Sequence, residues 1–215
     1  MAGAGRIEVF FDCSSPWTYL AFENLQPLAI ELGASMDWRP ILVGGVFNTV
    51  NPSVYESRAT PVPAKARYML KDLQDWATLA GLKIKMPPTV FPVNSVKAMR
   101  ACLVVARQGR LVDFARAVFQ AYWSQDADIS QDTVLEAICS RLGLDADVLA
   151  QAADPAIKAE LKANTDELIA RGGFGSPTMF VNGDHMYFGN DRLELIRAAL
   201  TRASRLDGRG DALHS

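Results

Sequence analysis

Cysteine is scarce in this sequence, and its placement excludes several kinds of chemistry. The 215 residues include three cysteines, Cys13, Cys102 and Cys139, which are widely separated and never form a Cys-x-x-Cys pair. Small disulfide-rich domains and zinc clusters need closely spaced or evenly paired cysteines. A dithiol exchange site is disfavoured for the same reason. Cys102 and Cys139 fall on apolar faces of predicted helices, so we expect both to be small core residues.

Histidine is scarcer still, which argues against a serine hydrolase. The sequence has two histidines, His185 and His214. A catalytic serine needs a general base that a third group orients. His185 follows the Asn182-Gly183 turn signal and His214 is the penultimate residue, so neither is a suitable base.

Strong charge and long apolar runs are both missing. The net charge is -2 and there is no basic block, so we expect no nucleic-acid surface. No apolar run approaches the roughly 20 residues of a membrane-spanning helix. The first six residues lead directly into a predicted strand without the apolar core of a signal peptide. We therefore expect a cytoplasmic protein that does not enter a membrane.

The hydrophobic pattern predicts an α/β chain whose strands lie near its two ends. Residues 7–12 and 36–43 are typical of strands, and residues 16–32 between them are typical of a helix that ends at Gly33. Residues 44–63 are rich in Gly, Asn and Pro, so we expect a long functional loop. About a hundred residues of helical pattern follow, and then two strands over residues 177–188 and a last helix that begins at Asn190 or Asp191.

This order is βαβ, a helical block, then ββα, which is the topology of the thioredoxin fold with an insertion. The crossover between the first two strands implies a parallel, right-handed pair. We expect a discontinuous thioredoxin-like domain formed by residues 1–62 and 172–215. Residues 63–171 are then an inserted, all-helical subdomain.

One stretch near the N-terminus has the pattern of an anion-binding helix start. A strand ends at Asp12, and Ser14-Ser15-Pro16 then leads into a helix. Proline suits the first helical position because its missing N–H has no helical partner there. The helix N-terminus carries unpaired donors and about half a positive charge, which favours an anion. Ser15 is equally suited to be a simple helix cap, and the local sequence leaves both roles open.

Four stretches together resemble a known family. They are FDCSSPWTYL at residues 11–20, WRPILVGGVF at 38–47, GFGSPT at 173–178 and FGNDRL at 188–193. The chain resembles the 2-hydroxychromene-2-carboxylate isomerases and the related kappa-class glutathione transferases, which belong to the DsbA-like branch of the thioredoxin superfamily. In that family an S-P-x-[S/T] sequence replaces the redox C-x-x-C, and residues 15–18 fit it.

The resemblance implies a glutathione site whose catalytic residue is Ser15. Ser15 would stabilise the thiolate of glutathione, with Thr18 at the position of the resolving cysteine and Cys13 buried nearby. Ser176 would precede a cis-proline, Pro177, and pair its backbone with the cysteinyl unit.

Further contacts are implied for the two ends of glutathione. Asn190 and Asp191 would bind the γ-glutamyl end. Asn51 would contact glutathione or substrate, with Asn48 as its rival. Lys65 or Arg67 would bind the glycine carboxylate of glutathione or an anionic substrate, although both could equally be surface charges.

The implied reaction is a glutathione-dependent isomerisation of a small aromatic carboxylate, with no metal. Trp17, Phe47 and the connection over residues 87–92 would line the aromatic pocket. Asn94 and Ser95 would begin the helix that binds the substrate carboxylate. The family also suggests a homodimer. A glutathione transferase or peroxidase with the same cofactor site is one alternative. A non-enzymatic module that binds a peptide along the cis-proline edge is another.

Overall fold

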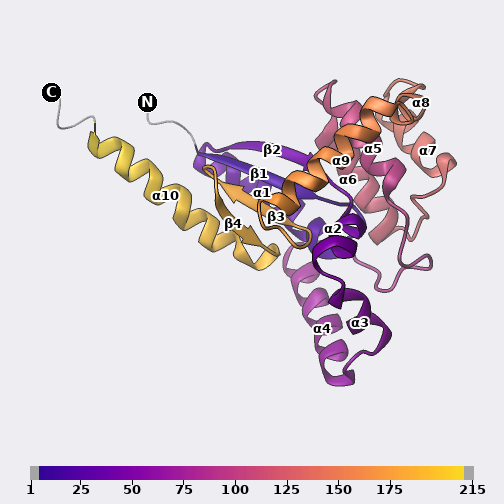
Figure 1. The fold of residues 1–215 in the computed structure, drawn as a ribbon, viewed down its shortest axis with the longest axis horizontal. Coiled ribbons are helices and arrows are strands. Elements are labelled where there is room, and N and C mark those ends of the chain that lie inside the picture. The colour runs from indigo at the N-terminus through magenta and orange to yellow at the C-terminus, as the bar shows by residue number, and fades with distance from the viewer. Residues whose placement is uncertain (1–4, 211–215) are drawn as a thin grey trace.

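The computed structural model describes residues 5–210, with side chains described up to residue 202. A four-stranded mixed sheet in the order β2-β1-β3-β4 stands between helices on both faces (Figure 1). Strand β1 (Arg6–Phe11) pairs in parallel with β2 (Ser35–Pro40) and antiparallel with β3 (Thr178–Val181), which pairs antiparallel with β4 (His185–Phe188). The predicted βαβ…ββα order is confirmed.

Alternation along β1 separates two apolar clusters, one on each face of the sheet. Ile7, Val9 and Phe11 point into the main core, together with α1 (Pro16–Leu32). Phe10 points the other way, toward a smaller cluster that includes Leu168 of α9 (Pro155–Ala170). The long C-terminal helix α10 (Leu193–Gly210) packs beside α1, after the short 3-10 turn η2 (Asn190–Arg192).

Between β2 and β3 the chain is helical, as the pattern predicts, although one element was not expected. The predicted helices correspond to α4 (Pro63–Leu79), α5 (Val96–Ala106), α6 (Leu111–Phe119), α7 (Asp132–Leu142) and α9. The short α8 (Val148–Ala152) was missed, and α6 continues into a π-helical turn, η1 (Gln120–Ser124). One cluster of buried residues includes side chains from these helices, from α1 and from β1. The division into two domains, with residues 63–171 as the insertion, stays a prediction.

The predicted loop over residues 44–63 is wrong, because that segment is mostly helical. Strand β2 ends at Pro40, and α2 (Val43–Val50) and α3 (Ser53–Ala59) follow it. Glycines at positions 44 and 45 lower the intrinsic helix propensity. The compensation is tertiary: the first N–H of α2, at Val43, donates to the carboxylate of Asp12, 2.9 Å away. Local sequence could not indicate that distant cap.

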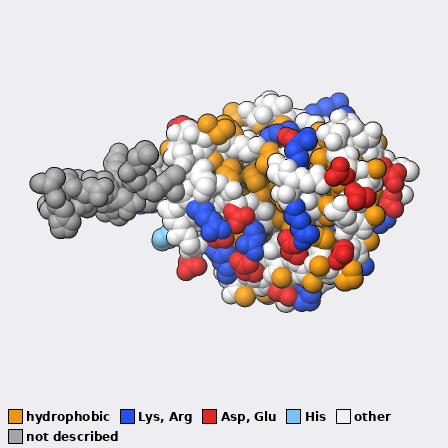
Figure 2. Space-filling view, turned by 90° about the horizontal axis from the view of Figure 1, so that it is seen from above, with side chains coloured by type: hydrophobic (Ala, Val, Ile, Leu, Met, Phe, Trp, Pro, Cys, Tyr) orange, Lys and Arg blue, Asp and Glu red, His pale blue; other side chains and the backbone are white. Residues whose placement is uncertain are grey.

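Figure 2 shows one face of the molecule, on which basic and acidic side chains are interspersed. Several of these charges form ion pairs near the sheet: Arg171 contacts both Glu8 and Glu167, and Arg39 contacts Glu167. None of the helices in residues 5–210 has the length and apolar character needed to cross a bilayer.

A buried tryptophan of the helical block supports the backbone that leads to Ser15. Trp123, in η1, is fully buried, and its indole nitrogen donates to the Cys13 carbonyl over 2.9 Å. Trp123→Phe leaves that carbonyl without its donor and opens a small void. We expect the free energy of unfolding to fall by about 2 kcal/mol in urea titrations. Trp76→Phe is the control, since Trp76 is half-buried on α4 and its indole nitrogen makes no hydrogen bond to the described residues. An equal loss in both variants would contradict this role.

An acidic side chain ties down the proline-rich connection between α4 and α5. Asp126 pairs with Lys85 and accepts bonds from the Thr89 backbone (2.7 Å) and hydroxyl (2.6 Å). These partners lower the pKa of Asp126 to about 2. The stabilisation is therefore fully present above pH 4 and is lost as the pH falls toward 2.

Asp126→Asn should remove that part of the acid dependence. Wild type should lose unfolding free energy more steeply than the variant between pH 4 and 2, as followed by circular dichroism. Asp184→Asn changes an exposed carboxylate of the β3–β4 turn that forms no ion pair with the described residues, and this variant should keep the wild-type slope. Parallel acid profiles for wild type and Asp126→Asn would refute the assignment.

Candidate active site

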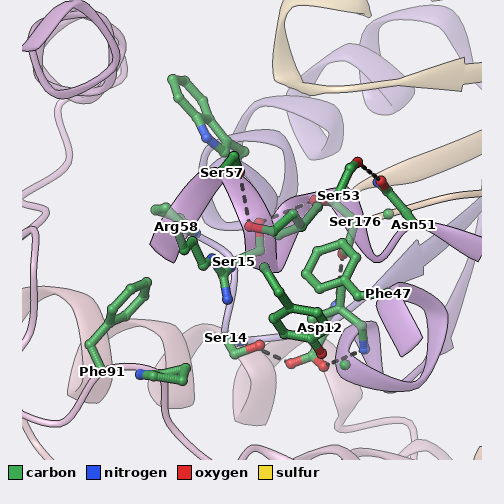
Figure 3. A pocket seen from close by; sticks show the side chains of 18 of the residues that line it. Asp12, Ser14, Ser15, Phe47, Asn51, Ser53, Ser57, Arg58, Phe91 and Ser176 are labelled. Carbon is green, nitrogen blue, oxygen red and sulfur yellow. Dashed lines mark hydrogen bonds between the residues drawn. The ribbon is translucent and has the colours of Figure 1, made fainter. Parts of the chain in front are cut away.

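A large cavity opens where the N-terminus of α1 meets α2, α3 and the start of α5 (Figure 3). Its volume is about 1430 Å³, which exceeds the roughly 300–1000 Å³ of a pocket for one small ligand. Six of the predicted site residues line it: Ser15, Trp17, Phe47, Asn51, Asn94 and Ser176. The cavity thus has room for a cofactor and a second molecule.

Ser15 is both the cap of α1 and a residue of the cavity wall. Its backbone is extended (φ -108°, ψ 124°), and its hydroxyl oxygen accepts from the Thr18 N–H at 3.2 Å. The same hydroxyl donates to the Ser176 carbonyl at 3.1 Å. The predicted helix start at Pro16 is confirmed, and Ser15 spans the gap between α1 and the segment before β3.

The bond between Ser176 and Pro177 is cis, as predicted. The Ser176 hydroxyl accepts from the Asp12 N–H at 3.1 Å and shares a hydrogen bond with the Thr18 hydroxyl at 2.8 Å. Ser176 and Thr18 are both buried. These bonds fix the cis segment against α1, so the backbone of Ser176 faces the helix start.

Asp12 is a residue of the site that the sequence analysis missed. Its carboxylate is 1% exposed and accepts from the N–H groups of Ser14 and Val43, each at 2.9 Å. The hydroxyls of Ser95 and Ser14 also contact it. Burial raises the pKa of Asp12, and these hydrogen bonds oppose the rise. The sequence did show an acidic residue at the end of a buried strand. Its partners, however, lie at the starts of three different helices, α1, α2 and α5, so the sequence alone could not indicate its role.

The asparagines differ in their relation to the cavity. Asn51 lies on its wall, where its amide donates to the Phe174 carbonyl at 3.1 Å and its oxygen accepts from Ser53 at 2.8 Å. Asn48 accepts from Tyr55 and is not among the lining residues. Asn94 caps the first N–H of α5, at Val96, over 3.1 Å. The structure therefore favours Asn51 over Asn48 as a residue that a ligand can touch.

Three predicted residues lie beside the cavity and not on its wall. Pro177, Asn190 and Asp191 are absent from the lining, although the Gly189 N–H donates to the Pro177 carbonyl at 3.1 Å. Asp191 is exposed and paired with Arg192. Their roles in ligand binding stay predictions.

Asn190 supplies the best test of whether glutathione fits here. Its side-chain nitrogen is buried and has no hydrogen-bond partner among the described residues. A buried donor without an acceptor costs about 1–3 kcal/mol. A carboxylate such as that of a γ-glutamyl group would be a suitable acceptor if the ligand extended from the cavity to η2, so the chemistry of this donor agrees with the implied cofactor.

The basic side chains of this region also differ in whether they line the cavity. Arg58 and Lys65 line the cavity, whereas Arg67 is exposed outside it. Arg58 was not singled out by the sequence analysis, because nothing local marks it.

Two alternative chemistries find no support in the geometry. Cys13 is fully buried, and burial raises the pKa of its thiol well above the usual value, so it is not a reactive thiolate. Cys102 and Cys139 are buried core residues, as predicted. His185 is exposed on β4 and does not line the cavity, while His214 lies outside the described residues.

Comparison with known proteins supports one family. The model of the DsbA-like thioredoxin domain matches residues 6–201. A 2-hydroxychromene-2-carboxylate isomerase from Sphingobium xenophagum is 30% identical, over 90% of this chain and 97% of that protein. Glutathione S-transferase kappa 1 from Homo sapiens is 28% identical, over 88% of each chain.

The fold comparison agrees with the sequence comparison. A solved structure of a 2-hydroxychromene-2-carboxylate isomerase superposes with a TM-score of 0.79 and 26% identity, covering 98% of this chain and 100% of that one. The chain belongs to the DsbA-like thioredoxin family, among relatives that are 2-hydroxychromene-2-carboxylate isomerases and kappa-class glutathione transferases.

Proposed function

We propose that this protein is a glutathione-dependent isomerase of a 2-hydroxychromene-2-carboxylate type of substrate, which it interconverts with trans-o-hydroxybenzylidenepyruvate or a related pair. The observation that carries the proposal is the position of Ser15. It caps α1 at the wall of the cavity, and its hydroxyl touches the carbonyl before the cis-proline. The relatives' names support both the isomerase activity and the use of glutathione.

Bound glutathione would supply a thiolate nucleophile, whose reversible addition to a conjugated carbon would turn a rigid double bond into a single bond that can rotate. Ser15 contributes a hydroxyl at a helix N-terminus, where hydrogen bonding and the helix dipole both favour an anion. A two-unit decrease in a thiol pKa corresponds to roughly 3 kcal/mol. One charge-assisted hydrogen bond and a helix start together are of that size.

The hydrogen bond between Ser15 and Ser176 would be exchanged when a ligand binds, which would free the Ser15 hydroxyl for the thiolate. In this structure Ser15 donates its one proton to the Ser176 carbonyl. A peptide N–H that reaches this carbonyl replaces the serine as donor. The Ser15 hydroxyl is then free to donate to an anion above the helix, so ligand binding itself orients the catalytic group.

The remaining space suits a second, aromatic molecule. Trp17 and Phe47 lie on the wall, and the start of α5 at Asn94 and Ser95 adds polar groups. We infer that the substrate occupies this part of the cavity while the cofactor lies against Ser15 and Ser176. A cytoplasmic location and a homodimer belong to the same proposal and stay predictions.

The decisive experiment is a mass balance of glutathione during turnover. Purified protein is mixed with reduced glutathione and the chromene substrate, and product and free thiol are both quantified. We expect many product molecules for each glutathione lost. Loss of one glutathione per product would instead identify a transferase, and absence of any glutathione affinity would favour a peptide-binding module.

A further inference from the structure

We propose that Arg58 binds the carboxylate of the second substrate, and that this substrate is an aromatic acid whose ring lies against the Phe47 and Phe91 side of the cavity. The proposal rests on the proposed function and assigns the residue that selects its substrate. Figure 3 shows Arg58, Phe47 and Phe91 lining the same pocket as Ser15.

Two aromatic rings hold the guanidinium in place. Its central carbon lies 5.7 Å from the ring centre of Phe47 and 5.6 Å from that of Phe91. Both distances are within the roughly 6 Å of a cation–π contact. The three residues come from α2, α3 and the connection before α5, so Arg58 is positioned at the junction of three segments.

The guanidinium has no acidic partner within the described part of the chain. Two acidic residues, Asp12 and Glu56, lie on the cavity wall with Arg58. Asp12 is buried and occupied by the N–H groups that it accepts. Glu56 is two positions away on the same helix and therefore points from a different side of it. The planar donor fork of Arg58 thus remains available, and it matches a carboxylate.

The apolar part of the cavity lining favours an aromatic acid over the glycine end of glutathione. Phe91 is 36% exposed, and Val62 and Met69 on the same cavity are 45% or more exposed. A flat ring would cover this apolar surface, and burial of apolar area is the main favourable term in such a site. The glycine end of glutathione is polar and gains little from it, whereas Lys65 offers it a separate cation.

The test measures binding of a simple aromatic acid without turnover. Calorimetry follows trans-cinnamate and its neutral analogue cinnamamide on the full-length protein and on Arg58→Gln. We expect Arg58→Gln to weaken cinnamate roughly tenfold or more, the usual effect of losing a hydrogen-bonded ion pair. Cinnamamide and glutathione should bind to the variant as they bind to wild type.

Two further variants separate charge from geometry. Arg58→Lys keeps the charge but loses the fork and the ring contacts, so its cinnamate affinity should be intermediate. Arg67→Gln removes an exposed charge outside the cavity and should leave cinnamate binding unchanged.

Several outcomes would overturn the proposal. They are equal cinnamate affinity in wild type and Arg58→Gln, no cinnamate binding by wild type, or a loss confined to glutathione, which would assign Arg58 to the glycine carboxylate. Failure of the proposed function is distinguishable: absent glutathione binding would refute that function, while an Arg58-dependent affinity for cinnamate would still establish this subsite.

Discussion

Ser15→Ala is expected to lower kcat/KM of the glutathione-dependent reaction by roughly 10²–10³-fold, as removal of one preorganised hydrogen-bond donor to a developing anion typically does. The reason is that Ser15 is the hydroxyl at the α1 N-terminus that faces the cis Ser176-Pro177 bond. Steady-state assays at saturating glutathione should show the loss mainly in kcat.

A structural role for Ser15 must be separated from this chemical one. Loss of the cap costs about 1 kcal/mol of helix stability in its own right, which urea unfolding measures. Ser15→Thr keeps both hydroxyl and cap and should retain substantial activity. Within the described part of the chain, the Ser57 hydroxyl on α3 donates to the Val54 carbonyl and to no other group. Ser57→Ala removes this hydroxyl from the same cavity and should behave as wild type. Nearly full activity in Ser15→Ala would refute the catalytic assignment.

Asp12→Ala is expected to destabilise the protein by roughly 2–4 kcal/mol. The substitution leaves the N–H groups of Ser14 and Val43 without acceptors, and each buried unpaired donor costs about 1–3 kcal/mol. It also removes the cap of α2. Denaturant titration measures the change. Asp37→Ala, which removes a partly exposed carboxylate paired with Arg6, should cost under about 1 kcal/mol.

The pH dependence of the Asp12→Ala effect has a definite sign. Burial raises the pKa of Asp12 in the folded state above its unfolded value near 3.8. The folded protein therefore holds the extra proton between these two pKa values, and its stability falls as the pH rises through that window. The cost of Asp12→Ala should accordingly be greatest at acidic pH. A cost that grows with rising pH would contradict the direction of the shift.

The parts of the fold that the sequence predicted are those with local causes. Gly33 ends α1 with φ 63°, the left-handed conformation that favours glycine. Pro16 starts the same helix, as the sequence predicts. The cis bond before Pro177 followed from the family resemblance and not from any local pattern.

The parts that it did not predict depend on contacts between distant residues. The helix α2 has two glycines in its first turn and is stabilised by Asp12, 31 residues earlier. Arg58 became a candidate only because Phe47 and Phe91 flank it in space. Asn190 and Asp191 were expected to bind the γ-glutamyl end of glutathione; η2 lies beside the cavity, and this role stays a prediction. In each case the deciding contact joins residues that are distant in the sequence, so local pattern could not indicate it.

The most direct test of the central claim is a crystal structure of the protein with reduced glutathione bound. We predict that the cysteinyl N–H donates to the Ser176 carbonyl and that the sulfur lies within hydrogen-bond reach of the Ser15 hydroxyl. Glutathione bound elsewhere, or with its sulfur turned away from Ser15, would contradict the account.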